Sequence, residues 1–231
     1  MEADFAVELG ADSETLEFPW AAAADGPRYY DLKRHPELLA QVEEAQRVPQ
    51  LGEFLRAMNA ASSILETAKC DAWESSEISA EEEIFGAACK FGSYVDLLFS
   101  AEELRFLFPA HERLVQRLTQ LLKRVPEIPA AAEFLIRRCY FHQGTETREG
   151  FYITFYLFGY ADDQEHAQDQ WTVGLKLVET GLRNHPSTSA PRPFSLVRIT
   201  DSRSMERNIV NRPNDAVRIS CARLGRMENR P

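Results

Sequence analysis

The alternation of hydrophobic and polar residues predicts four strands in the middle of the chain. They span residues 63–74, 92–99, 133–142 and 151–160 and are rich in β-branched and aromatic residues. Successive side chains of a strand point to opposite faces, so each run can present one face to a core. A shorter alternation at Thr15–Trp20 predicts an edge strand, because Pro19 cannot donate a hydrogen bond within a sheet.

Apolar residues at helical spacing predict four helical regions, at residues 36–58, 79–89, 100–125 and 162–184. The first region indicates two short helices, or one helix that is kinked at Pro49. The third indicates a long amphipathic helix, which we expect Pro109 to kink.

These elements predict an α+β fold with a mainly antiparallel sheet and helices packed on one face, in a ferredoxin-like or tandem strand-helix-strand-strand arrangement. Side-chain alternation then divides the strand residues between two faces. The helix-covered face is expected to hold Ala68, Cys70, Ala72, Val95, Leu97, Phe99, Leu135, Cys139, Phe141, Ile153, Phe155 and Leu157. The opposite face is expected to hold Lys69, Asp71, Trp73, Tyr94, Asp96, Arg138, Tyr140, His142, Tyr152, Thr154 and Tyr156.

A strand-strand-helix order occurs twice in this prediction. The segments Gly92–Phe99 and Gly150–Leu157 share a pattern of Gly, any residue, Tyr, a β-branched residue and two alternating large apolar residues. Each follows a strand with a central cysteine, Cys70 or Cys139. The match is short, so either a true duplication or chance can explain it.

The face opposite the helices is the candidate functional surface, because it combines aromatic rings with charges of both signs. Large exposed aromatic area is typical of a ligand or partner site. The ligand-binding candidates are Trp73, Tyr94, Asp96, Arg138, Tyr140, His142, Tyr152 and Tyr156. Cross-strand aromatic pairs also stabilise sheets, so cover by a second subunit or by the chain itself stays open as an alternative.

Composition divides the chain into three regions. Residues 1–35 form a weakly patterned segment with the possible edge strand, residues 36–186 form the α+β body, and residues 187–231 form a tail with Arg and Pro that we expect to be loosely ordered. The net charge of −10 is uneven, with −15 on residues 1–185 and +5 on residues 186–231. An acidic body repels phosphate backbones, so no nucleic-acid partner is expected.

Targeting and cysteine usage indicate a cytoplasmic protein. No run of about 18 apolar residues is present for a membrane span, and the acidic N-terminal segment does not resemble a secretory signal. The four cysteines are widely spaced, which favours a reduced compartment. No membrane partner is therefore expected.

Motifs for metal, cofactor or nucleophilic chemistry are not recognisable, so no metal and no cofactor are expected. Cys139 and His142 are three residues apart on a predicted strand, so they point to opposite faces and cannot hold one ion. The acids around His166 suit a helix start without a metal. His111 lies on an apolar helix stripe, where a hydrogen-bonded core histidine is the expected role.

The sequence leaves three functional hypotheses. The leading one is a non-catalytic, regulatory domain, possibly a homodimer, that binds a small molecule or a protein on the aromatic face. The second is an enzyme that uses Asp71, Asp96, Arg138 and His142 in a cleft on that face. The third is a structural or scaffolding protein whose face is closed.

Overall fold

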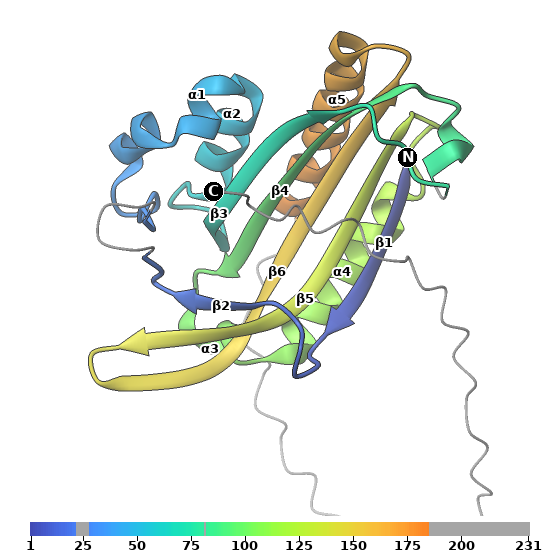
Figure 1. Cartoon of the computed structure of the whole chain (residues 1–231). Helices are drawn as coiled ribbons and strands as arrows, with labels where there is room; N and C mark the ends of the chain where they lie inside the picture. The colour runs from blue at the N-terminus through green and yellow to red at the C-terminus, as the bar shows by residue number, and fades with distance from the viewer. Residues whose placement is uncertain (22–27, 81, 185–231) are drawn as a thin grey trace, which may run out of the picture. The chain divides into compact units, whose positions relative to one another are not determined.

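A six-stranded mixed sheet forms the centre of the computed structural model, which describes residues 1–21, 28–80 and 82–184 (Figure 1). The strands are β1 (Glu2–Glu8), β2 (Thr15–Phe18), β3 (Leu65–Ser75), β4 (Cys89–Phe99), β5 (Ala130–Gln143) and β6 (Glu146–Ala161). Their order is β1-β5-β6-β4-β3, and β2 also pairs with β5. The pairs β3–β4, β4–β6 and β5–β6 are antiparallel, whereas β1 and β2 run parallel to β5.

The α+β class is therefore confirmed, but the sheet is mixed because of its first two strands. The edge strand expected at Thr15–Trp20 corresponds to β2. The strand β1 was not predicted, although Ala3, Phe5 and Val7 alternate there with charged or small residues. The predicted tail at residues 187–231 lies outside the described residues.

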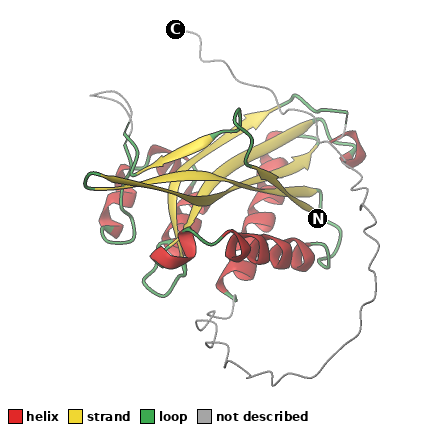
Figure 2. Ribbon diagram, turned by 90° about the horizontal axis from the view of Figure 1, so that it is seen from below, coloured by secondary structure: helices red, strands yellow, loops and turns green. Residues whose placement is uncertain are grey.

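Helices cover one face of the sheet. The long helices are α4 (Phe108–Leu122) and α5 (Gln164–Arg183), and both lie on the same side of the strands (Figure 2). The shorter elements are η1 (Pro36–Gln41), α1 (Glu43–Arg47), α2 (Pro49–Met58), η2 (Glu82–Phe85) and α3 (Glu102–Arg105). Figure 1 shows α1 and α2 beside β3. None of the described helices is long and apolar enough to span a membrane.

Prolines set several helix boundaries. The predicted break at Pro49 is confirmed, because α2 begins there, and a further break at Val42 separates η1 from α1. Pro109 lies in the first turn of α4 instead of kinking a longer helix, since its missing N–H has no intrahelical partner there. The acidic helix predicted at residues 79–89 is only the single turn η2.

The main core lies between the sheet and the helices. Phe134 on β5 stacks on Phe155 on β6, with ring centroids 5.1 Å apart. Trp171 of α5 is fully buried, and its Nε1 donates a hydrogen bond of 2.9 Å to Ser93 Oγ on β4. Gly159 allows α5 to approach β6, because a Cβ at this position would lie 2.2 Å from Trp171 N. The histidine predicted for a core role, His111, is fully buried against the rings of Phe99 and Phe151.

A second, smaller core lies on the opposite face of the sheet, where β2 pairs with the end of β5. Its buried members are Leu16, Phe18, Leu98, Cys139, Phe141 and Tyr152. Arg105 lies over the rings of Phe18 and Phe141 and donates a hydrogen bond of 2.5 Å to Glu66. The face opposite the long helices is therefore partly closed.

The predicted faces need two corrections. On β5 the assignment is out of phase: Leu135, Cys139 and Phe141 share a face with Thr154 and Tyr152, whereas Arg138 and Tyr140 lie on the other side. His142 is in register with Arg138 and Tyr140, but near the end of β5 it pairs with Glu17 of β2 and also lines the groove described below. Phe134 and Ile136 occupy the helix face instead. The strand is apolar on both faces, so alternation did not fix its phase.

The second correction concerns β3, which carries a bulge between Thr67 and Cys70. Thr67 faces Leu97 and Cys70 faces Val95, so two residues of β3, Ala68 and Lys69, oppose the single residue Asp96. Ala68 consequently packs in the small core and not under the helices.

Candidate functional site

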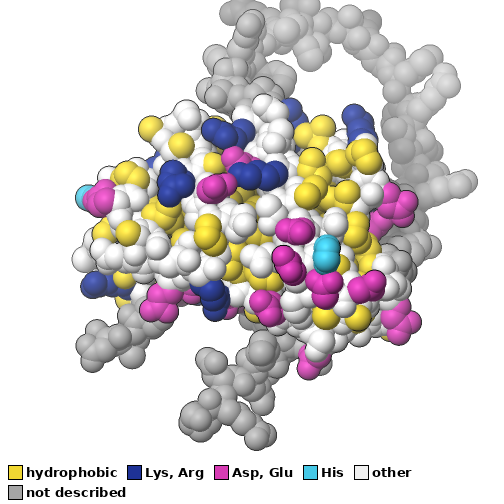
Figure 3. Space-filling model, turned by 90° about the horizontal axis from the view of Figure 1, so that it is seen from above, with side chains coloured by type: hydrophobic (Ala, Val, Ile, Leu, Met, Phe, Trp, Pro, Cys, Tyr) yellow, Lys and Arg dark blue, Asp and Glu magenta, His cyan; other side chains and the backbone are white. Residues whose placement is uncertain are grey.

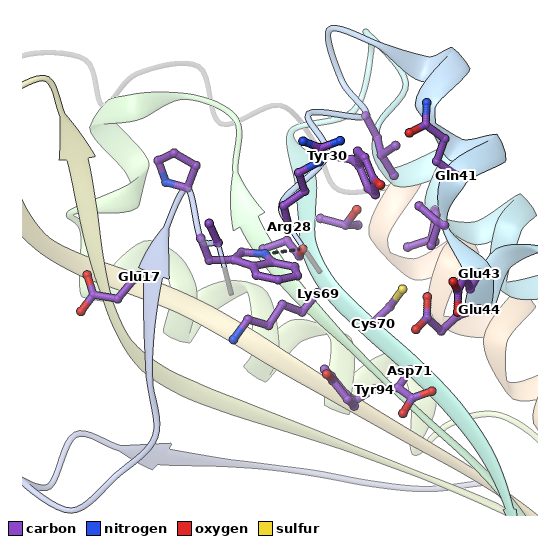
Figure 4. A pocket seen from close by; sticks show the side chains of 18 of the residues that line it. Glu17, Arg28, Tyr30, Gln41, Glu43, Glu44, Lys69, Cys70, Asp71 and Tyr94 are labelled. Atoms are coloured by element: carbon purple, nitrogen blue, oxygen red, sulfur yellow. Dashed lines mark hydrogen bonds between the residues drawn. The ribbon is translucent and has the colours of Figure 1, made fainter. Parts of the chain in front are cut away.

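A groove on the face opposite the long helices is the candidate functional site. Its cavity volume is about 1080 Å³, slightly above the range of about 300–1,000 Å³ that is usual for small-molecule sites. One wall follows β2, a second is formed by η1 and α1, and β3 with β4 forms the floor (Figure 4). Its lining includes Glu17, Trp20, Arg28, Tyr30, Gln41, Glu43, Glu44, Lys69, Cys70, Asp71, Tyr94 and His142.

The bulge in β3 positions the floor of the groove. Because Ala68 and Lys69 both oppose Asp96, the bulge directs Lys69 to the face opposite the long helices. Trp20 Nε1 donates a hydrogen bond of 3.0 Å to Ala68 O, which holds the indole over the same stretch of β3. Lys69 Nζ lies 5.3 Å from the centroid of the Trp20 ring, a cation–π distance.

The charges of the groove are unequally paired. Asp71 on the floor pairs with Arg47 at 2.9 Å, and Glu17 of β2 pairs with His142. Figure 4 places Glu43 and Glu44 on the wall formed by α1, whereas Lys69 extends toward β2. The lining therefore carries more acids than Lys and Arg residues, and Lys69 extends away from the acids of α1.

Lys69 differs from the other half-buried or buried Lys and Arg residues of the described ranges, because it alone has no hydrogen bond or ion pair within them. The other Lys and Arg residues of this kind each have partners. Three of them donate hydrogen bonds to backbone carbonyls: Lys33, Arg117 and Arg138. Three others pair with acids: Lys90 with Glu82, Arg105 with Glu66, and Arg137 with Glu8 and Glu14.

A buried polar network lies under the groove. Asp96 is 3% exposed and accepts a hydrogen bond of 2.8 Å from Thr154 Oγ1, which in turn accepts one of 3.2 Å from Arg137 Nη1. Burial raises the pKa of Asp96 to about 7, against the opposing effects of the Thr154 hydrogen bond and the charges of Lys69 and Arg137. This carboxyl thus changes charge near neutral pH.

The residues predicted for ligand binding are distributed over several environments. Tyr94 and His142 line the groove, and Asp96 lies beneath it. Trp73 and Tyr156 belong to a row of aromatic rings through Phe158, with centroid distances of 6.1 and 6.5 Å. Tyr152 is buried in the small core. Arg138 and Tyr140 lie on the other side of β5, where Arg138 donates to the carbonyls of Leu9 and Gly10.

The four residues proposed for catalysis have separate partners. Asp71 binds Arg47, Asp96 binds Thr154, Arg138 binds backbone carbonyls, and His142 binds Glu17 and Thr147. No hydrogen bond connects any two of the four.

Trp20, Tyr30 and Lys69 are among the lining residues that sequence reasoning did not select as site residues. Trp20 and Tyr30 come from the first 35 residues, where only a short strand was predicted. Trp20 is the last residue of the alternating segment Thr15–Trp20, whose first four residues form β2, and this segment was the signal available in the sequence. Lys69 was predicted on this face. The alternation of residues along a strand does not give the distances between charged side chains of different elements, so it could not show that Lys69 has no partner within the described residues.

The described thiols and carboxylates do not form a reactive centre of familiar type. Burial raises the pKa of the Cys70 thiol, as does the nearby charge of Glu44, so the thiol stays protonated near neutral pH. Within residues 1–21, 28–80 and 82–184, no group of three or more His, Cys, Asp and Glu side chains is arranged to hold a metal ion.

Seen from above, acidic side chains gather around a histidine on one side of the molecule, and Lys and Arg gather on another side (Figure 3). Asp163 and His166 at the start of α5 form an acid–histidine pair, with Asp163 Oδ2 2.7 Å from His166 Nδ1. Asp163 also accepts a hydrogen bond from His166 N and so caps the helix, as acids at a helix start commonly do.

Comparisons with family models, curated proteins and solved structures found no match to this chain.

Proposed function

We propose that this protein is a non-catalytic binding domain whose groove between β2, β3 and α1 takes a small organic molecule with a flat, aromatic body. The observation that carries this proposal is the half-buried indole of Trp20, held by Ala68 O above a groove of about 1080 Å³. Tyr30 and Tyr94 add two half-buried aromatic rings to the lining. Rigid aromatic side chains offer large contact area at low cost in conformational entropy.

Binding is favoured over catalysis by the chemistry of the lining. The Cys70 thiol is held in its protonated form, and the acids and bases suggested for catalysis each have separate partners. A regulatory role fits a domain that binds without reacting. The assignment of the topology to a ferredoxin-like or a tandem strand-helix-strand-strand fold stays a prediction. The proposed binding function does not depend on this assignment.

The test uses the indole N–H signals of the three tryptophans in the 15N-labelled full chain. Indole is titrated as the probe, and the Trp20 signal is assigned with the Trp20→Phe variant. We expect the Trp20 signal to shift and the signal of Trp171, buried under the helices, to stay in place. A titration in which indole moves the Trp73 or Trp171 signal while that of Trp20 stays fixed would contradict the proposal.

The alternative that this face joins two copies of the chain rests on the half-buried rings of Trp73 and Tyr156. A homodimer of this kind buries both residues, so light scattering on the full chain and on Trp73→Ala distinguishes it. We expect the mass to be the same for both proteins, because the groove is formed by one copy.

A further inference from the structure

Lys69 lines the groove and has no hydrogen bond or ion pair within the described residues. It is half-buried, and it projects from the bulge of β3 over the Trp20 ring at 5.3 Å. No acid or carbonyl of the described residues lies within bonding distance of its ammonium group. An ammonium group that has no counter-ion and lies beside an aromatic ring can form a charge-assisted hydrogen bond with an added anion.

A single negative charge fits this position better than a cluster of charges. Arg28 adds a second cation on the same lining, but the opposite wall carries Glu43 and Glu44 (Figure 4). These acids, together with Glu17 and Asp71 on the same lining, repel a polyanion such as a nucleotide triphosphate more strongly than a single carboxylate.

We propose that the ligand of the groove is an aromatic carboxylate, whose ring packs against Trp20 and whose carboxylate binds Lys69 Nζ. This inference rests on the proposed function, which it narrows from aromatic molecules in general to aromatic monoanions. The ammonium group then gains a charge-assisted hydrogen bond, while Trp20 and Tyr94 contact the ring.

The test compares three probes with the same indole ring and different charge: indole, indole-3-acetate and tryptamine. Each is titrated into the 15N-labelled full chain, and the Trp20 indole N–H signal gives the dissociation constant. We expect indole-3-acetate to bind about tenfold more tightly than indole, and tryptamine to bind no more tightly than indole.

Three variants assign this preference to one side chain. Lys69→Met keeps the apolar stem and removes the charge, so the preference for indole-3-acetate over indole should fall to within about twofold. Lys69→Arg retains a cation and should keep the preference. Lys123→Met removes an exposed charge at the end of α4, away from the groove, and should change nothing. The indole N–H spectrum of each variant shows whether it is folded.

The outcomes separate this inference from the function on which it rests. If none of the three probes shifts the Trp20 signal, the proposed function itself fails. If indole binds but indole-3-acetate binds no better, or if Lys69→Met keeps the full preference, the groove is an aromatic site and the carboxylate inference is overturned.

Discussion

Asp96 on β4 and Thr154 on β6 face each other at the centre of the sheet, and Thr154 Oγ1 donates a hydrogen bond of 2.8 Å to Asp96 Oδ1. They hold equivalent places in the two similar segments Gly92–Phe99 and Gly150–Leu157. The antiparallel register is symmetric about this pair, since Val95 faces Phe155 and Leu97 faces Ile153. The two segments that match in sequence thus lie in β4 and β6, which pair with each other in a register that is symmetric about Asp96 and Thr154.

The cysteines do not share this symmetry. Cys70 faces Val95, whereas Cys139 faces Gly150 and lies in the small core on the opposite face. Their similar place in the sequence pattern is therefore not a structural equivalence.

The buried carboxyl at the symmetric position makes the protein less stable at higher pH. Asp96 has a pKa of about 7 in the folded chain and of 3.8 when exposed, so between these values the folded state holds the proton that the unfolded state loses. Stability contributed by this group is complete below about pH 4 and falls as the pH rises to 7. The loss above pH 7 is on the order of 4 kcal/mol.

The substitution Asp96→Asn should therefore raise the free energy of unfolding more at pH 8 than at pH 5, because the amide keeps the Thr154 hydrogen bond and never ionises. Urea denaturation at both pH values measures the difference. Asp12→Asn, in an exposed turn, is the matched control and should leave the pH dependence unchanged. Equal gains for Asp96→Asn at pH 5 and pH 8 would show that Asp96 is ionised throughout.

The same carboxyl should link ligand binding to proton uptake. Asp96 is influenced by Lys69 from β3, Arg137 from β5, Glu14 from the turn before β2 and the Thr154 hydroxyl from β6. An anion beside Lys69 weakens the attraction that keeps Asp96 ionised, so the bound state holds more protons. The affinity for indole-3-acetate should then rise as the pH falls from 8 to 6.

Calorimetry in buffers of different ionisation enthalpy measures this proton uptake directly. Asp96→Asn removes the titrating group, so its affinity for indole-3-acetate should vary little over the same range. A wild-type affinity that is flat with pH, or that rises toward pH 8, would argue against the linkage.

Two tyrosines that alternation places on one face should respond differently to substitution. Tyr152 is 1% exposed in the small core, so Tyr152→Ala should cost about 3 kcal/mol of stability. Tyr94 is half-buried in the groove lining, so Tyr94→Ala should weaken indole binding at a much smaller cost in stability. Urea denaturation and the indole titration measure the two effects, and equal loss of stability in both variants would contradict the assignment.

The contact between α5 and β6 gives a prediction for the main core. A Cβ on Gly159 would lie 2.2 Å from Trp171 N and 2.3 Å from Ala167 O, both backbone atoms that cannot move independently of the helix. Gly159→Ala should therefore destabilise the fold by about 2–3 kcal/mol. Gly10→Ala, which meets only the Ser13 hydroxyl at 3.3 Å, is the control. A Gly159→Ala variant as stable as this control would exclude the close approach.

The sequence allowed the class of the fold and most element positions to be predicted, because β4, β6 and α5 each have one clearly apolar face. It did not fix the phase of β5, since Phe134, Leu135 and Ile136 are all buried and alternation requires a polar face. The bulge at Ala68 and Lys69 arises because both residues lie opposite Asp96 of β4. The local pattern of residues in β3 does not show how this strand pairs with β4.

The candidate site was predicted only in part for the same reason. Tyr94 and His142, two of the predicted ligand-binding residues, line the groove, but the groove itself depends on how Trp20, Arg28 and Tyr30 lie relative to β3. Trp20 contacts β3 through the Ala68 carbonyl, 48 residues away in sequence. Ion pairs between residues far apart in the sequence depend on the fold and not on the spacing of residues along the chain. The sequence therefore could not show that Lys69 has no partner within the described residues.

The most direct test of the central claim is a crystal structure of the full chain with indole-3-acetate. The account predicts that the indole ring packs against Trp20 in the groove and that the carboxylate lies within hydrogen-bond distance of Lys69 Nζ. An indole-3-acetate molecule bound outside the groove, or one whose carboxylate lies away from Lys69 Nζ, would contradict it.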